Sequence, residues 1–284
     1  MNLTIGITGA GGYVGSRLCE ALTAAGHDVI RFVRRPGAND RFFSLGDLAS
    51  PDDFEDLDIL IHCAWDMQAS NVDAVRRTNI EGSLHLLAAA RAAGVSRIIF
   101  ISTMSAYSGC KSVYGQAKLE VETMVRQFRG ISIRPGLIYG DNPGGIVGRL
   151  LQLAERTPVL PMIGTGNYPL HTCHEDDLCE LVLIACMASD RNLPPVITAA
   201  EFTGRRFRDI VQTLSRRELR FIPIPWRLAW FGLRGLESVG LRPPIKSDSL
   251  IGLVHSNPAP DFSPLQRLGA RFRVLQPPEP EKTA

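Results

Sequence analysis

The chain has 284 residues, of which 45% are apolar and 21% are charged, and its 31 basic and 29 acidic side chains leave a formal net charge of +2. This length and composition predict a globular protein with a substantial core, organised as one large domain or slightly more. The nearly neutral balance, without a block of Lys and Arg, lacks the electrostatic footprint that nucleic acids require, so no nucleic-acid partner is expected.

The cysteines and the first residues bear on the compartment. The first residues show no basic stretch followed by an apolar one, and no window holds about 18 uninterrupted apolar residues. We therefore expect a cytoplasmic protein with no membrane partner. Six cysteines lie mostly in apolar periodic segments without a C-x-x-C pair, which indicates buried thiols in a reducing compartment rather than disulfides or zinc ligands. They are Cys19, Cys63, Cys110, Cys173, Cys179 and Cys186.

The segment ITGAGGYVGSRL, residues 7–18, concentrates glycine directly after the short apolar run LTIGIT. From Tyr13 onward apolar residues recur at helical spacing, so the glycines occupy a strand-to-helix turn. Gly9 permits the tight turn, Gly12 lets backbone N–H groups approach a pyrophosphate, and Gly15 lets helix and strand pack closely. The pyrophosphate of a dinucleotide would rest at the helix N-terminus, where unpaired N–H groups and the helix dipole favour an anion.

Strand-like and helix-like segments then alternate along the first half of the chain. Amphipathic stretches such as 79–94 and 114–128 have helical spacing. Between the helical stretches lie apolar runs typical of strands: 28–33, 41–48, 57–64, 97–103 and 131–140. The alternation predicts an α/β fold, a Rossmann-type doubly wound parallel sheet that binds a dinucleotide at the carboxyl ends of its strands.

Past about residue 145 the segments become shorter, richer in proline and less regular. That change predicts a smaller C-terminal lobe that closes over the substrate. The expected division has three parts: a Rossmann domain of residues 1–145 with returning segments from about 171–200, a substrate-binding lobe of 146–170 and 201–275, and a disordered tail, 276–284.

Tyr114 and Lys118 stand four residues apart at the start of a helical pattern, so both project from one helix face. A phenol has a reference pKa near ~10, and a neighbouring cation is what favours its ionised form at neutral pH. The segment ISTMSAYSG follows a central strand and brings the hydroxyls of Ser102, Thr103 and Ser105 to the same sheet edge. These residues predict a proton-transfer site next to the dinucleotide.

The end of the second predicted strand bears on the cofactor. NAD-binding enzymes place an acidic residue there, about 20 residues beyond the glycines, to bind the ribose hydroxyls. Here the strand ends at Val33 and is followed by Arg34 and Arg35, with the nearest acids at Asp28 and Asp40. Arg34 can present its guanidinium to a 2′-phosphate, so we expect NADP to be preferred, with NAD possible and the arginines as solvated loop residues in the alternative reading.

From residue 3 to about 225 the chain resembles the extended short-chain dehydrogenase/reductase family, which includes the NAD-dependent epimerase/dehydratase group. The resemblance rests on eight motifs: TGAGGYVG, GDL at 46–48, IHCA at 61–64, TNIEGS at 78–83, STMSAY at 102–107, YGQAK at 114–118, RPGLIYG at 134–140 and HEDDL at 174–178. The resemblance implies that Tyr114 is the general acid/base, that Lys118 is its electrostatic partner and ribose clamp, and that Thr103 polarises the substrate carbonyl.

The same resemblance implies that Asp47 lies near the adenine, Ala64 beneath the cofactor and Pro135 at the start of a loop beside the nicotinamide. Together with the glycine turn and the two arginines, these residues define the expected cofactor-binding set. It comprises Gly9, Gly12, Tyr13, Val14, Gly15, Arg34, Arg35, Asp47, Leu48, Ala64, Thr103, Tyr114, Lys118 and Pro135.

Two departures from the family pattern matter. Tyr107 and Tyr114 are only seven residues apart, where the family usually has about twenty, and this leaves the catalytic hydroxyl open between Thr103, which we favour, and Ser105. The sugar-nucleotide 4,6-dehydratases carry Asp-Glu after the catalytic Thr, whereas here Met104 and Ser105 occupy those positions. Dehydration therefore lacks its acid/base pair.

Three other features have competing readings. His171 and His174 beside acidic residues suggest a metal cluster, but an acid-capped helix start explains them, so no metal is predicted. His62 is interpreted as a satisfied core histidine. The aromatic, amphipathic segment 225–241 could lie on a membrane surface, but we favour a substrate-pocket wall or a packed helix.

We predict an NAD(P)-dependent oxidoreductase that moves a hydride between the nicotinamide and a carbonyl or secondary alcohol of a small polar substrate, most plausibly a sugar or nucleotide-sugar. One alternative is a nucleotide-sugar 4-epimerase that holds its cofactor tightly, and another is a non-catalytic cofactor-binding subunit. The family resemblance also implies a homodimer through the helices at 79–93 and 114–128.

Overall fold

The computed structural model describes residues 2–69, 71–141, 143–189, 193–241, 243 and 245–277. Within these residues, seven parallel strands form the central sheet in the order β11-β6-β5-β4-β1-β2-β3. The strands are β1 (Thr4–Thr8), β2 (Asp28–Val33), β3 (Asp40–Phe42), β4 (Ile59–His62), β5 (Arg97–Ile101), β6 (Ile131–Pro135) and β11 (Val196–Ala199). The strand order reverses between β1 and β4, and the crevice at such a switch point is where open α/β sheets bind ligands.

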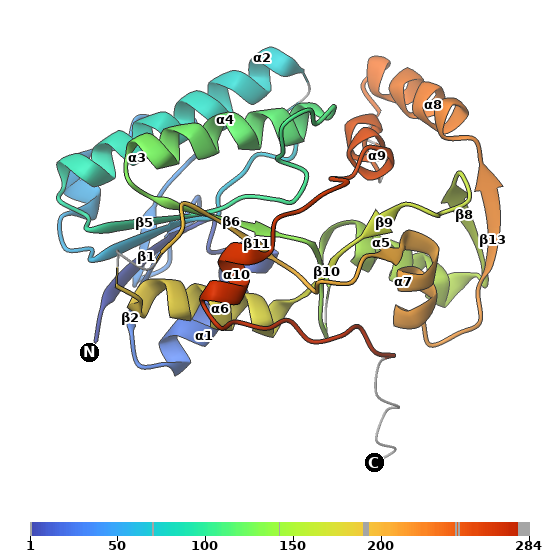
Figure 1. The fold of residues 1–284 in the computed structure, drawn as a ribbon. Helices are drawn as coiled ribbons and strands as arrows, with labels where there is room; N and C mark the ends of the chain where they lie inside the picture. The colour runs from blue at the N-terminus through green and yellow to red at the C-terminus, as the bar shows by residue number, and fades with distance from the viewer. Residues whose placement is uncertain are drawn as a thin grey trace.

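Helices cover both faces of this sheet (Figure 1). On one face lie α1 (Tyr13–Ala24), α6 (Glu175–Met187) and α10 (Ser263–Arg267). On the other lie α2 (Val72–Val75), the π-helical turn η2 (Arg76–Glu81), α3 (Gly82–Ala92) and α4 (Val113–Gln127). A 3₁₀ turn, η1 (Pro51–Phe54), precedes β4. The doubly wound parallel fold expected from the sequence is confirmed.

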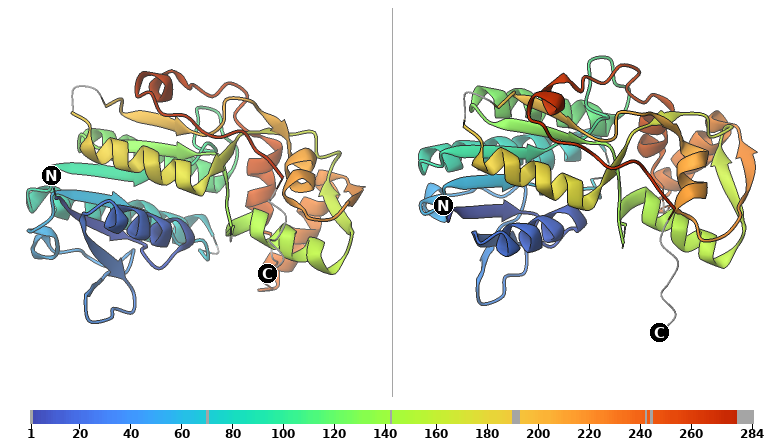
Figure 2. Two further views of the ribbon diagram at one scale, coloured as in Figure 1. Left: turned by 90° about the horizontal axis from the view of Figure 1, so that it is seen from below. Right: turned by 60° about the horizontal axis from the view of Figure 1, so that its bottom comes forward.

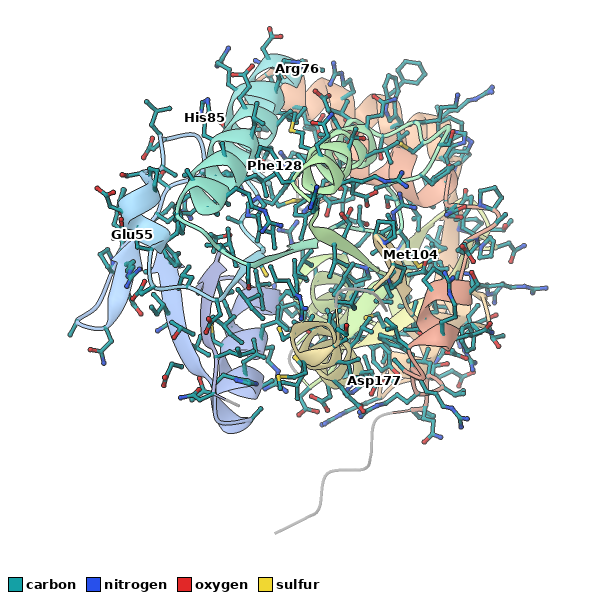
Figure 3. The ribbon with its side chains drawn as sticks, turned by 60° about the vertical axis from the view of Figure 1, so that its left-hand side comes forward. Glu55, Arg76, His85, Met104, Phe128 and Asp177 are labelled. Carbon is teal, nitrogen blue, oxygen red and sulfur yellow. The ribbon has the colours of Figure 1, made fainter. Side chains whose placement is uncertain are left out.

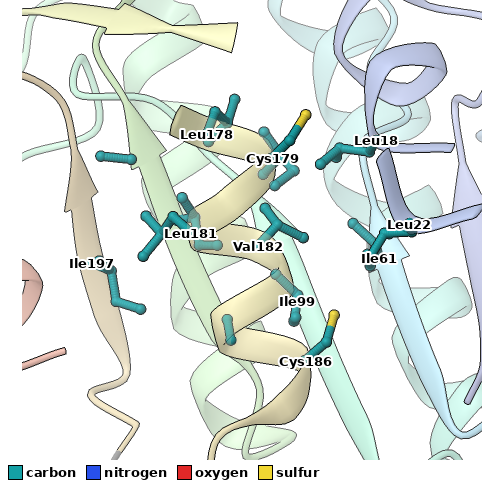
Figure 4. Packing of buried hydrophobic residues seen from close by; sticks show 14 of the residues in the cluster. Leu18, Leu22, Ile61, Ile99, Leu178, Cys179, Leu181, Val182, Cys186 and Ile197 are labelled. Atoms are coloured by element: carbon teal, nitrogen blue, oxygen red, sulfur yellow. The ribbon is translucent and has the colours of Figure 1, made fainter. Parts of the chain in front are cut away.

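Each central strand buries side chains on both faces, as parallel strands between two helical layers must. On β5, Ile99 joins the core cluster beneath α1 and α6, while Ile98 joins the cluster beneath α3 and α4. Figure 4 shows the first cluster, where Leu178, Leu181 and Val182 of α6 pack between strands and α1. Because both faces are sealed, solvent and ligands reach the sheet at its strand ends.

A smaller lobe lies at the end of the sheet toward which its strands run (Figure 2). Its helices are α5 (Gly145–Arg156), α7 (Phe207–Leu214), α8 (Trp226–Ser238) and α9 (Ser247–Val254). Its strands form three two-stranded pairs: β7 (Leu137–Tyr139) with β10 (Thr172–His174), β9 (Pro169–Leu170) with β12 (Arg205–Arg206), and β8 (Val159–Ile163) with β13 (Arg220–Ile224). Leu160, Met162 and Phe207 contribute to a core that belongs to the lobe alone.

The structure differs from the sequence-based expectation in three places. The run 41–48 forms only the short β3, and its remainder is a loop. The run 131–140 splits at Gly136, whose N–H bonds to Ala199 at the sheet edge while the next residue bonds to His171, so β7 leaves the sheet. Residues 263–275, expected in the lobe, return to the sheet, where Leu265 and Phe272 join the core beneath α6.

Of the expected tail, 276–284, the part from residue 278 on lies outside the described residues. In the portion of the chain that the structure describes, no helix is long and apolar enough to cross a membrane.

Candidate active site

Three glycines shape the turn between β1 and α1. Gly9 has a φ of +69°, and a Cβ there would lie 2.7 Å from the Ala64 nitrogen. A Cβ on Gly15 would overlap the Gly9 carbonyl oxygen, so a larger residue would push α1 away from β1. Gly12 is the N-cap, and within the fully described α1 the first turn has neither a capping side chain nor an acidic residue. The N–H groups of Tyr13, Val14 and Gly15, which precede the first intrahelical bond from Ser16 to Gly12, are therefore available to an anion.

The carboxyl end of β4 lies beside this turn. The Ala64 N–H donates to the Thr8 hydroxyl at 3.3 Å, which fixes Ala64 against the glycines. His62 is fully buried, with Nδ1 2.8 Å from the Thr8 hydroxyl and Nε2 2.9 Å from the Ser83 hydroxyl. Burial lowers the pKa of His62 to about 3, and the Lys118 charge acts in the same direction. His62 is thus the satisfied core histidine that the sequence indicated.

Tyr114 stands in the first turn of α4, half-buried, with its phenol at the carboxyl end of β5. Burial raises the pKa of Tyr114 to about 12, while a side-chain hydrogen bond with Thr103 acts in the opposite direction. The Ser105 hydroxyl instead lies toward Gly252 of α9, 3.9 Å from where a Cβ on that glycine would stand. Of the two hydroxyls, Thr103 is the one that acts on the pKa of Tyr114, and the choice of Thr103 as the catalytic hydroxyl stays a prediction.

Lys118 follows one turn later on α4 and is only 3% exposed. Its ammonium donates to the Ile101 carbonyl at 2.7 Å and lies 4.1 Å from the Trp65 ring centre and 4.4 Å from the Phe100 ring centre. Burial lowers the pKa of Lys118 to about 7, against the smaller raising effects of Cys63 and Glu122. A lysine held in this way can exchange its proton near neutral pH.

A buried ion pair behind Lys118 was not predicted from the sequence. Glu122, one turn beyond Lys118, accepts two hydrogen bonds from Arg134 of β6, at 2.8 and 2.6 Å, and one from the Ser102 hydroxyl. These contacts tie α4 to β5 and β6 beneath the site. The i, i+4 spacing from Lys118 to Glu122 was the available signal.

Trp65 was also missed. Its ring meets the Tyr114 ring edge-on with centroids 5.8 Å apart. The loop that carries it is fixed by Asn79 in the π-helical turn η2, which accepts from the Asp66 N–H at 2.7 Å and donates to the Asp66 carbonyl at 3.2 Å. Trp65 therefore forms a wall of the space around Tyr114 and Lys118, and its position directly after Ala64 was the only signal for it in the sequence.

The smaller lobe contributes Asp248 of α9. Its carboxylate accepts from the N–H of Val113 at 2.7 Å and from the N–H of Tyr114 at 2.9 Å, while the Ser112 hydroxyl accepts from the next N–H of α4. Asp248 also lines a cavity of about 500 Å³ between α4, α8 and α9. The other residues around this cavity are Lys111, Val113, Trp230, Arg234, Ser247, Ile251 and His255. The segment 225–241 therefore supplies part of a pocket wall.

The predicted adenosine-binding residues follow β2 and β3, the strands at the edge of the sheet beyond β1. Arg34 and Arg35 follow β2 directly and are exposed, as are Asp47 and Leu48 in the loop after β3. Asp40, the nearest acid beyond β2, is taken up by an ion pair with Arg31 at 3.4 Å. Within the described residues, the end of β2 carries no carboxylate.

Pro135 ends β6, and its carbonyl accepts from the Met104 N–H at 3.0 Å. The loop after β6 therefore lies beside the hydroxyl-bearing loop after β5, and Met104 of that second loop is labelled in Figure 3.

At the start of α6 the predicted acidic caps are wrong in detail. The capping side chain is His174, whose Nδ1 accepts from the Asp176 N–H at 3.2 Å. The acids make other bonds because arginines and a phenol face them.

Those partners tie α6 to its neighbours. Glu175 accepts from the Tyr13 hydroxyl and pairs with Arg17 at 3.3 Å, and Asp177 pairs with Arg273. Tyr13 thus links the glycine turn to α6. The part of the chain that the structure describes contains no group of three or more His, Cys, Asp or Glu side chains able to hold a metal ion.

A glycine turn with an uncapped helix start, next to a Tyr, Lys and Thr cluster at the carboxyl edge of a parallel sheet, defines a dinucleotide-binding protein with proton-transfer residues. Comparisons with known proteins agree with this class. The model of the NAD dependent epimerase/dehydratase family matches residues 5–198, and the chain belongs to that family.

Similar proteins include reductases and epimerases. A ceramide reductase of Caulobacter vibrioides is 32% identical over 190 residues, which span 63% of this chain and 59% of that protein. A UDP-glucose 4-epimerase of Vibrio cholerae is 26% identical over 82% of each chain. The solved structure of a UDP-glucose 4-epimerase with UDP-glucose from Thermotoga maritima superposes with a TM-score of 0.73 at 21% identity, covering 96% of this chain and 94% of that one.

Proposed function

We propose that this protein is an NAD(P)-dependent oxidoreductase that interconverts a carbonyl and a secondary alcohol. The observation that carries the proposal is the placement of Tyr114 with Thr103 beside the buried Lys118, at the same sheet edge as the uncapped start of α1. Family membership supports a nicotinamide cofactor.

Each residue then has a defined task. The N–H groups at the start of α1 hold the pyrophosphate, and the nicotinamide, when bound, supplies or accepts the hydride at its C4 atom. Tyr114 transfers the proton to or from the substrate oxygen, and the Thr103 hydroxyl donates a hydrogen bond to that oxygen. Lys118 turns from the Ile101 carbonyl to a ribose hydroxyl and favours the ionised form of Tyr114.

NADP is the proposed cofactor, with NAD as the alternative. The exposed Arg34 and Arg35 at the end of β2 support it, together with the engagement of Asp40 by Arg31. A guanidinium binds a phosphate through two parallel hydrogen bonds, whereas a carboxylate at this position would repel it.

A sugar or nucleotide-sugar is the proposed substrate class, supported by the similarity to two UDP-glucose 4-epimerases. The similarity to a ceramide reductase favours a second candidate, a carbonyl compound with an apolar chain. The cavity beside α4 has a lining that suits either substrate class. Trp230 and Ile251 are apolar, whereas Lys111 and Arg234 are cationic.

Absorbance of the reduced nicotinamide tests the proposal with purified protein, NADPH or NADH, and a panel of 4-ketosugar nucleotides and long-chain ketones. Stoichiometric loss of the band with one substrate class supports the oxidoreductase and names the class. Turnover of a nucleotide-sugar without any change in added cofactor would instead establish the 4-epimerase. Cofactor binding without turnover of any substrate would favour the non-catalytic subunit.

We also propose a homodimer that pairs α3 and α4 with their two-fold mates. These helices lie side by side over the sheet, and Figure 3 shows Arg76 and His85 on the outer side of the helical layer. Leu84 of α3 is 37% exposed, and in this dimer it packs against the partner. A monomeric sedimentation profile at micromolar concentration would contradict the dimer.

A cytoplasmic location is supported by six free cysteines, which suit a reducing compartment.

A further inference from the structure

Helix α8 has two faces with different surroundings. The inner face carries Trp226, Trp230 and Glu237, at the spacing i, i+4, i+11, and it contacts α9. The Trp226 ring meets the His255 ring edge-on with centroids 6.1 Å apart, and Trp230 lines the cavity. The Glu237 carboxylate accepts from the Ser247 N–H at 2.8 Å and from the Ser247 hydroxyl at 2.6 Å. This face packs on α9 and lines the cavity, and whether the cavity is the substrate pocket expected from the sequence stays a prediction.

The outer face of α8 is apolar and uncovered. Leu228, Phe231 and Val239 are 65%, 66% and 72% exposed, and they lie on one stripe of the helix. Gly232 and Gly235 complete the stripe, and a Cβ built on either would meet no atom within 4 Å. Figure 1 shows α8 at the edge of the lobe with α9 on its inner side. An apolar helical stripe of this kind usually marks a surface that another phase or molecule covers.

The charge of α8 and of the segment that contains it indicates the charge of the surface that would cover the stripe. Arg227 and Arg234 are exposed and lie on the border of the stripe. The segment 205–246 holds ten Lys and Arg against three Asp and Glu, a formal charge of +7, whereas the whole chain carries +2. The lobe therefore carries the positive charge of the molecule, and the remainder is net negative.

We propose that α8 docks the substrate lobe onto an anionic phospholipid surface, with Leu228, Phe231 and Val239 inserted among the acyl chains and the flanking arginines at the headgroups. Helices that lie in the membrane interface combine these same features, an apolar stripe and a basic border. A second copy of the chain fits less well, because an antiparallel two-fold contact through α8 would bring the arginine borders of both copies together. Docking would turn the outer side of the cavity wall toward the lipid phase. The proposal does not depend on the reaction that the site performs.

Vesicle flotation tests the docking with the full chain. Vesicles of phosphatidylcholine alone are compared with vesicles that also contain phosphatidylglycerol, at low and high salt. We expect binding to the anionic vesicles and a clear decrease at high salt, since the headgroup attraction is screened. Leu228→Glu with Phe231→Glu should reduce the vesicle-bound partition coefficient by about tenfold or more, because each lost side chain removes apolar burial.

The matched control is Val274→Glu, which changes a valine that is 54% exposed outside the segment. It should bind vesicles like the wild type. All variants are checked for an unchanged thermal unfolding transition and unchanged cofactor binding. The proposal is wrong if the wild type ignores anionic vesicles, if the double variant binds as well as the wild type, or if sedimentation shows that Phe231→Glu dissociates a dimer.

Discussion

Asp248 of the smaller lobe caps the helix that carries Tyr114, with one carboxylate oxygen accepting from the Val113 N–H and the other from the Tyr114 N–H. An α-helix leaves its first N–H groups unpaired, and here the first two receive a carboxylate from a residue more than 130 positions away. The contact fixes both the start of α4 and the position of the lobe over it.

We expect Asp248→Asn to lower kcat by roughly tenfold to 100-fold, because the amide keeps one acceptor oxygen and the phenol loses part of its fixed position. Asp248→Ala should lower kcat further and cost about 1 kcal/mol of unfolding free energy, the usual effect of losing a cap. Cofactor affinity should not change in either variant.

The control for this role is Asp261→Ala, since the Asp261 carboxylate accepts from the Ser263 N–H at 2.9 Å at the start of α10, away from the site. It should lose similar stability and keep kcat. A kcat for Asp248→Asn equal to that of the wild type would contradict the positioning role.

For the proposed acid/base, Tyr114→Phe should keep the fold and cofactor binding and lower turnover by about two to four orders of magnitude. Tyr107→Phe is the matched control, because its hydroxyl donates to the His255 carbonyl at 2.9 Å and has no assigned chemical role. Steady-state kinetics decide the matter, and activity of Tyr114→Phe within about threefold of the wild type would exclude the assignment.

Lys118 makes the stability of the cofactor-free protein depend on pH. Burial lowers its pKa to about 7 in the folded protein, below the value of about 10.4 in an unfolded chain. Between these values the unfolded chain binds more protons, so the free energy of unfolding should rise as the pH increases from about 7 to 10. Below pH 7 Lys118 is charged in the folded protein, so the free energy of unfolding is lowered by the full cost of desolvating its ammonium.

Lys118→Met should therefore be more stable than the wild type at pH 6, by up to a few kcal/mol, and this difference should shrink as the pH approaches 10. Urea unfolding across this range measures it. Lys111→Met, which changes an exposed lysine, should show no such trend. A Lys118→Met difference that stays constant with pH would disprove the effect.

The cofactor preference should depend on Arg34. A charge-assisted contact of about 1.5–3 kcal/mol with the 2′-phosphate corresponds to roughly 10- to 150-fold in affinity, which Arg34→Ala should remove for NADPH while NADH binding stays the same. Fluorescence titrations with both cofactors at fixed salt measure this. Arg220→Ala is the control, because Arg220 is an exposed arginine on β13 of the smaller lobe and not at the end of β2. Tighter binding of NADH by the wild type would show that the arginine does not select the phosphate.

The local patterns in the sequence determined that the chain forms a parallel sheet and in which order strands and helices follow one another along the chain. They also determined the positions of the glycines, Tyr114 and Lys118. Each of these depends on residues close together in the chain: a glycine turn between a strand and a helix, or two side chains one helical turn apart. Such patterns could be read without the fold because local conformation follows from local spacing.

Tertiary structure alone decided which distant residues complete the site. It placed Asp248 at the start of α4 and returned residues 263–275 to the sheet. It also separated the two faces of α8, since spacing shows an amphipathic helix but not which face is covered. The physical reason is that these contacts join segments far apart in the chain, and their geometry depends on packing that no local period encodes.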